Sequence, residues 1–121
     1  MVYSLGTRRG IGPPNPHSDV AIKVKLESMR VVAQDYDTAR YLSTGTASYS
    51  GFCSDPRARE LLDGIAQHGK TGVCNDSDDA WAACSPLYND VDKNWCVDSK
   101  GNSKSAPNIT CASSWKSTEC P

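Results

Sequence analysis

Six cysteines are the residues of this chain with the most distinctive chemistry. They are Cys53, Cys74, Cys84, Cys96, Cys111 and Cys120. A zinc site normally uses closely spaced pairs of ligands, and no two of these cysteines form a C-x-x-C pair, so the spacing argues against zinc. Their even number favours three disulfides. Because disulfides persist in oxidising compartments, the sequence predicts an exported protein.

The spacing of the cysteines does not determine how they pair. Our expected pairs are Cys74–Cys96, Cys111–Cys120 and Cys53–Cys84. The first would join segments that we interpret as neighbouring strands. The second would close a short terminal loop, and the third follows by elimination.

Oxygen-bearing side chains alternate at Asp90, Asp92 and Asn94, as they do in a calcium-binding loop. The EF-hand pattern then requires a Gly and a later Glu at fixed positions, whereas Trp95 follows here. We therefore interpret the segment as a solvated turn and keep a calcium site as the lesser alternative. We predict no cofactor.

The C-terminal third combines cations with an aromatic residue at Lys100, Lys104, Trp115 and Lys116. An aromatic ring can stack on a nucleic-acid base while lysines neutralise phosphates. The formal net charge of −1 gives no general attraction to nucleic acid. We therefore prefer the interpretation that Trp115 covers a disulfide, and we keep a ligand site for DNA as a hypothesis.

An enzyme would need a nucleophile and a base in one pocket. His68 is the only histidine within the presumed folded part, and it stands beside Gly69 at the end of a predicted helix. There an imidazolium simply suits the helix dipole. We predict a protein without catalytic activity.

The sequence predicts two helices. Apolar residues recur at spacings of four, three, four and three, which predicts one face of a helix over 19–42 that is capped by Ser18 or Asp19. These residues are Ile22, Leu26, Met29, Ala33 and Tyr36. A loop follows, and Asp55-Pro56 is a start signal for a short helix over about 56–67.

Three strands are predicted over 72–75, 80–87 and 94–99, within a sheet that spans about 70–105. The polar tail beyond Ser103 has room for one more short strand, and residues 106–121 are closed by Cys111 and Cys120. Residues 1–18 are rich in Arg, Gly and Pro and lack any period, so we interpret them as a flexible leader that replaces a native N-terminus. The prediction is one α+β domain over 19–121, with the first helix packed on an antiparallel sheet of three to four strands.

Several segments carry a resemblance to a known family. They are Ala21-Ile22-Lys23-x-x-Leu26-x-x-Met29-Arg30, Gly51-Phe52-Cys53-Ser54-Asp55-Pro56, Cys74-Asn75, Ala80-Trp81-Ala82 and Trp95-Cys96-Val97-Asp98-Ser99-x-Gly101. Over roughly residues 19–105, the chain resembles the type IV pilin and pseudopilin family of bacteria. The resemblance implies a long N-terminal helix packed on an antiparallel sheet. Cys84 and the tail with Cys111 and Cys120 are not part of the family pattern.

The resemblance also implies a function. Pilins are exported and assemble into filaments through an apolar N-terminal half-helix, which begins with a Phe-rich motif carrying a Glu at its fifth position. This sequence lacks that half, so it would comprise the soluble half of the helix and the globular head. The full-length form would be anchored in the membrane before it assembles with other pilin subunits.

The expected function is therefore that of a non-catalytic structural subunit of an extracellular type IV pilus or pseudopilus, with an exposed head for adhesion, motility or uptake. One alternative is a minor pilin-type binding module for DNA or a surface ligand. Another is a stand-alone secreted Cys-rich protein. The sequence does not distinguish a major from a minor pilin, or a pilus from a secretion pseudopilus.

Overall fold

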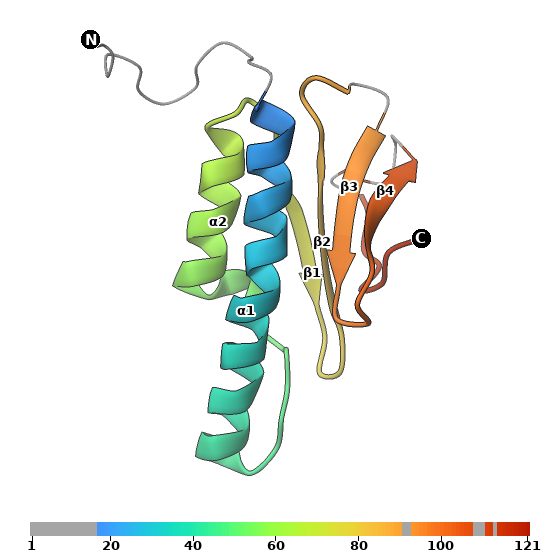
Figure 1. The fold of residues 1–121 in the computed structure, drawn as a ribbon. Helices are drawn as coiled ribbons and strands as arrows, with labels where there is room; N and C mark the ends of the chain where they lie inside the picture. Colours follow the sequence, from blue (N-terminus) through green and yellow to red (C-terminus); the bar gives the residue numbers. More distant parts are fainter. Residues whose placement is uncertain (1–16, 91–92, 108–110, 113) are drawn as a thin grey trace, which may run out of the picture.

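The computed structural model describes residues 17–90, 93–107, 111–112 and 114–121. Its elements are α1 (Ser18–Thr44), the short 3-10 helix η2 (Phe52–Ser54), α2 (Pro56–Ala66), β1 (Val73–Asp76), β2 (Trp81–Pro86), β3 (Lys93–Asp98) and β4 (Ser103–Pro107). The two long helices lie side by side on one face of the sheet (Figure 1). The predicted α+β architecture is thus confirmed, including the fourth strand. None of the helices within these described residues is long and apolar enough to cross a membrane.

Helix α1 forms because its apolar residues line up on one side. Ile22, Leu26, Met29 and Ala33 are all buried against the sheet and α2. The helix ends at Gly45, whose φ of 81° is the left-handed conformation that glycine adopts most easily, and whose N–H donates to Tyr41 O. The prediction of a helix over 19–42 is confirmed to within two residues at each end.

The predicted cap of α1 was wrong. His17 occupies the N-cap position and makes no side-chain cap hydrogen bond. The Asp19 carboxylate instead accepts hydrogen bonds from the backbone N–H groups of Tyr88, Asn89 and Asp90, at 2.6, 2.9 and 3.0 Å. Asp19 therefore fastens the start of α1 to the loop that follows β2, a contact that local sequence does not reveal.

Helix α2 begins as the sequence predicts. The Asp55 Oδ1 atom accepts a hydrogen bond from Arg57 N at 2.9 Å, and Pro56 stands in the first turn. Because Pro has no N–H to satisfy and a φ suited to a helix, this pair starts the helix at little cost. Ala58 and Ile65 are buried and contribute to the same core as α1.

The sheet has the strand order β1-β2-β3-β4, and every neighbouring pair is antiparallel. Successive side chains of a strand point to opposite faces. Trp81, Ala83 and Val97 accordingly join the core under the helices. Cys84 and Cys96, which are opposite one another in the register of β2 and β3, point to the other face.

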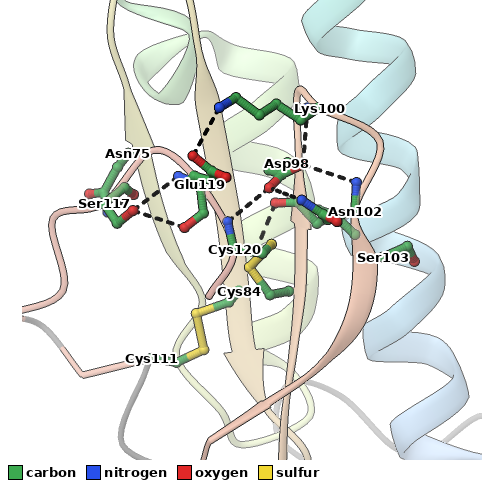
Figure 2. The surroundings of a disulfide bond; sticks show 12 residues. Asn75, Cys84, Asp98, Lys100, Asn102, Ser103, Cys111, Ser117, Glu119 and Cys120 are labelled. Atoms are coloured by element: carbon green, nitrogen blue, oxygen red, sulfur yellow. Dashed lines mark hydrogen bonds and ion pairs between the residues drawn. A yellow bond between two sulfur atoms is a disulfide. The ribbon is translucent and has the colours of Figure 1, made fainter.

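The C-terminal strap, residues 111–112 and 114–121, covers this second face. Cys111 and Cys120 lie buried there with Cys84, Cys96 and Ala106, and the Trp115 ring packs against the group. Figure 2 shows the strap crossing the sheet beside the Cys84–Cys111 disulfide. The central strands are therefore enclosed on both sides, which explains why β2 is buried along nearly its whole length.

All three predicted disulfide pairings, Cys74–Cys96, Cys111–Cys120 and Cys53–Cys84, were wrong. The structure pairs Cys53 with Cys74, Cys84 with Cys111 and Cys96 with Cys120, with Cα–Cα distances of 5.7, 5.8 and 5.9 Å.

The reason lies in the strand order and in the two faces of the sheet. Cys74 on β1 and Cys96 on β3 are separated by β2, and two strand spacings of ~4.8 Å exceed the reach of a disulfide. Cys74 and Cys53 both pack against the core under the helices, whereas Cys84 points to the strap. The two strap cysteines each bond to a strand and not to each other.

We expect Leu26→Ala to lower the free energy of unfolding by about 2 to 5 kcal/mol, because it leaves a cavity in the core beneath α1. Val31→Ala is the matched control on the same helix. Val31 is exposed, so its truncation should change stability by no more than about 0.5 kcal/mol. Equilibrium urea denaturation of the oxidised protein measures both. Equal effects of the two substitutions would contradict the packing described here.

Candidate functional site

An apolar row runs along the outer side of α1. It comprises Val20, Val24, Val31 and Leu42, whose exposed fractions are 57, 56, 64 and 78%. Their spacings of four, seven and eleven residues are close to whole turns of 3.6, so the four side chains share one side of the helix. That side is opposite the buried stripe that contains Leu26 and Met29.

The apolar row is not explained by the stability of α1 itself. Valine forms helices less readily than Ala, Lys or Glu, so three exposed valines do not strengthen the helix. Single exposed apolar side chains are common on protein surfaces, and the polar residues Asp35 and Thr38 lie between Val31 and Leu42, so what distinguishes the four is their alignment on one side of α1. The row is therefore the surface of α1 best suited to packing against another apolar surface. None of these four residues was predicted to be functional, although the spacing of the valines was a readable signal.

The second feature is the Asp98 carboxylate, which is fully buried beneath the strap. Its Oδ1 accepts hydrogen bonds from the backbone N–H groups of Lys100 and Asn102, both at 3.0 Å. Its Oδ2 accepts from Asn102 Nδ2 and from the backbone N–H of Cys120, both at 2.8 Å. Figure 2 shows these bonds converging from the β3–β4 turn and from the strap.

This arrangement keeps Asp98 ionised. Burial by itself would raise the pKa of the carboxyl, but the hydrogen bonds from Asn102, Cys120 and Lys100 outweigh it and hold the pKa below its ordinary value of 3.8. A buried charge is tolerated only when such bonds replace its water. The carboxylate therefore binds the strap to the turn after β3, and its role is structural.

Arg30 holds the same turn from the helix side. Its guanidinium donates to the backbone oxygens of Asp98 and Asn102, while its Nε donates to Glu27 at 3.0 Å. Ser103 of β4 donates to the other Glu27 oxygen. The turn between β3 and β4 is thus attached to α1 on one side of the sheet and to the strap on the other.

Polar contacts also hold the rest of the strap. Asn75 Nδ2, on β1, donates to the backbone oxygens of Trp115 and Ser117 at 3.1 and 2.9 Å. Lys100 Nζ and Glu119 Oε1 form an exposed ion pair at 2.9 Å. Glu119 raises the pKa of the Lys100 ammonium through its hydrogen bond and its charge. The strap is consequently joined to β1, β2 and β3 at separate points.

Two of the four residues proposed for DNA, Lys100 and Trp115, make contacts within the protein. The Glu119 carboxylate balances the charge of Lys100, and the Trp115 ring packs on the disulfide cluster, which is the arrangement that the sequence analysis preferred. Lys104 and Lys116 are exposed. DNA binding by these residues stays a prediction.

The residues considered for calcium do not form a visible ligand set. Asp90 is exposed and lies 3.8 Å from Lys93 Nζ, whereas Asn94 is buried in β3. Asp92 falls outside the described residues. Within the part of the chain that the structure describes, no three His, Cys, Asp or Glu side chains come close enough together to hold a metal ion.

His68, the histidine considered as a catalytic base, follows the C-terminal end of α2. In the described parts of the chain, no hydrogen bond links its imidazole to a Ser, Asp or Glu side chain.

Comparisons with protein-family models, with curated proteins and with solved structures find no match for this chain. The function must therefore be inferred from the geometry of the chain itself.

We expect Asp98→Asn to destabilise the protein by about 3 kcal/mol near neutral pH. Each carboxylate oxygen accepts two N–H donors, so the amide NH₂ of an asparagine would face two donors in either orientation. Asp63→Asn, at an exposed position of α2, is the control and should change stability by no more than about 0.5 kcal/mol. Urea denaturation with intact disulfides measures both.

The pH dependence of this destabilisation should show that it arises from the ionised Asp98 carboxylate. Because its pKa is lower in the folded than in the unfolded chain, its contribution is complete above the ordinary value of 3.8 and is lost as the pH falls through the lowered pKa. The stability difference between the unaltered protein and Asp98→Asn should therefore shrink progressively below about pH 4. A difference that is constant down to about pH 2 would contradict an ionised Asp98.

Proposed function

We propose that this protein is a structural subunit of an extracellular filament of the type IV pilin or pseudopilin kind, without catalytic activity. The observation that carries the proposal is the apolar row of Val20, Val24, Val31 and Leu42 on the outer side of α1. In the pilin family the main contact between subunits is made by the apolar half-helix that this sequence lacks, and the row on the outer side of α1 would extend that contact along the head.

The energetics of the row fit repeated weak contacts. Complete burial of an exposed valine or leucine side chain contributes about 1.5 to 3 kcal/mol, so covering these half-exposed residues gives a few kcal/mol per subunit. Such a contact is weak between two molecules and becomes strong when every subunit in a filament repeats it. The buried stripe leaves α1 firmly held by the head, so the row is presented on a rigid element.

The three disulfides support an extracellular setting for the head. Each joins segments that are more than twenty residues apart in sequence, so together they restrict the unfolded chain over most of residues 53–120. Disulfides form and persist in oxidising environments outside the cytosol. A head of this kind would keep its fold outside the cell, where adhesion, motility or uptake contacts take place.

The test is whether the protein is found in filaments. In the organism that encodes the chain, we expect the protein in the surface fraction released by mechanical shearing, as detected by immunoblotting and immunogold electron microscopy. Val24→Asp combined with Val31→Asp should lower its amount in that fraction at least about tenfold, because charges would have to be buried against a neighbour. The circular dichroism melting curve should barely change, since both positions are exposed.

Ala39→Asp is the matched control. It also replaces an exposed apolar residue of α1 with a carboxylate, but it lies about 60° to 80° around the helix from Leu42 and Val31, to one side of the row. Filament incorporation should survive this change. Recovery of the unaltered protein only as a monomer in the culture medium would overturn the proposal and favour the stand-alone secreted protein.

A further inference from the structure

The three disulfides differ in their accessibility to solvent. Cys84, Cys96, Cys111 and Cys120 are all buried between the sheet and the strap. Cys53 and Cys74 are only partly buried, at the margin of the core beneath the helices. An external thiolate must reach a sulfur atom to attack it, so accessibility separates one bond from the other two.

The Cys53–Cys74 bond also lines a cleft of about 440 Å³ between α2 and β1. Leu62 and Ala66 of α2 form part of its wall, and Gly72 and Cys74 lie on the opposite side, at the start of β1. The short helix η2, which carries Cys53, contacts both α2 and β1. Arg59 and Asp63, which also line the cleft, are exposed to solvent, so a small molecule can reach it from the surface of the folded chain.

We propose that Cys53–Cys74 is a thiol–disulfide exchange site, at which a small dithiol or the dithiol of an oxidoreductase reduces this bond alone. A thiolate of the dithiol attacks one protein sulfur, forms a mixed disulfide and releases the other sulfur as a thiolate. The second thiol of the reagent then displaces the remaining protein sulfur. The reagent leaves as its own disulfide, and two electrons and two protons end on Cys53 and Cys74. The reverse sequence closes the bond.

The surroundings of the bond keep its opening local. The Asp76 carboxylate accepts hydrogen bonds from the backbone N–H groups of Gly51 and Cys53, at 3.1 and 2.8 Å. Asp78 accepts another from Ser48 Oγ at 3.1 Å, and its backbone oxygen accepts from Tyr49 N. The loop that carries Cys53 therefore stays attached to the β1–β2 turn after reduction, which keeps the two thiols close enough to pair again.

The other two disulfides cannot be opened locally in this way. Cys96–Cys120 and Cys84–Cys111 hold the strap over the sheet, and the backbone N–H of Cys120 is one of the donors to buried Asp98. Access to either bond requires the strap to lift and the Asp98 carboxylate to lose partners. Their reduction therefore depends on partial unfolding, which is rare in a stable protein.

Differential alkylation of the unaltered protein tests this assignment. The oxidised protein is treated with dithiothreitol for increasing times, quenched with N-ethylmaleimide, digested and analysed by mass spectrometry. We expect Cys53 and Cys74 to be labelled together at least about tenfold faster than the four strap cysteines, as accessibility predicts. Near-UV circular dichroism should remain largely native at that stage. Faster labelling of Cys96 with Cys120, or simultaneous labelling of all six, would overturn the proposal.

Two variants test the cleft itself as the route of attack. Arg59 and Asp63 both line it, and the attacking thiolate is an anion. Arg59→Gln should therefore slow labelling of Cys53 and Cys74 about two- to threefold at low salt, whereas Asp63→Asn should speed it by a similar factor. Both effects should fade in high salt, and labelling of the strap cysteines should not respond. Equal rates in both variants at low salt would contradict entry through this cleft.

Discussion

The buried carboxylate of Asp98 is the group on which the closed arrangement of the sheet depends. Four N–H donors surround it, from the turn after β3 and from the strap. Withdrawing any of them would leave a charge partly unpaired in a buried place, which costs several kcal/mol. The need to keep the Asp98 carboxylate fully hydrogen-bonded therefore holds the strap against the sheet independently of the disulfides. It also places Cys120 where it can reach Cys96.

The two faces of the sheet divide the molecule into parts with different properties. On one face, α1 and α2 bury a continuous apolar core around Phe52, Leu26 and Trp81. On the other, a short polar strap depends on two disulfides and on hydrogen bonds from Asn75 and to Asp98. A strap of this length has too few apolar residues to bury a core of its own, so covalent bonds replace hydrophobic contacts there.

This division leaves two features of the helical side free for contacts. The apolar row on α1 is exposed because the core uses only the opposite side of that helix, and it forms the basis of the proposed filament contact. The Cys53–Cys74 bond is only partly buried and lines the cleft beside α2. The loop that carries Cys53 is held in place by hydrogen bonds to Asp76. The proposed assembly and the proposed thiol exchange therefore involve separate surfaces, and neither requires the strap to open.

Much of the local structure was determined by the sequence alone. The spacing of Ile22, Leu26 and Met29 predicted α1, the pair Asp55-Pro56 predicted the start of α2, and polar turns separated the strands correctly. These features depend on neighbours along the chain, so periodicity and turn chemistry suffice to find them. The α+β class followed from the order of the elements.

Contacts between distant residues were decided only by the tertiary structure. The disulfide pairing depended on strand order and on which face of the sheet each cysteine occupied, and Asp98 gained its role from a strap more than twenty residues away. The Asp19 carboxylate likewise does not cap α1 but accepts hydrogen bonds from the loop after β2. Because one carboxylate can cap a local helix or bind distant N–H groups equally well, only the folded chain selects between them.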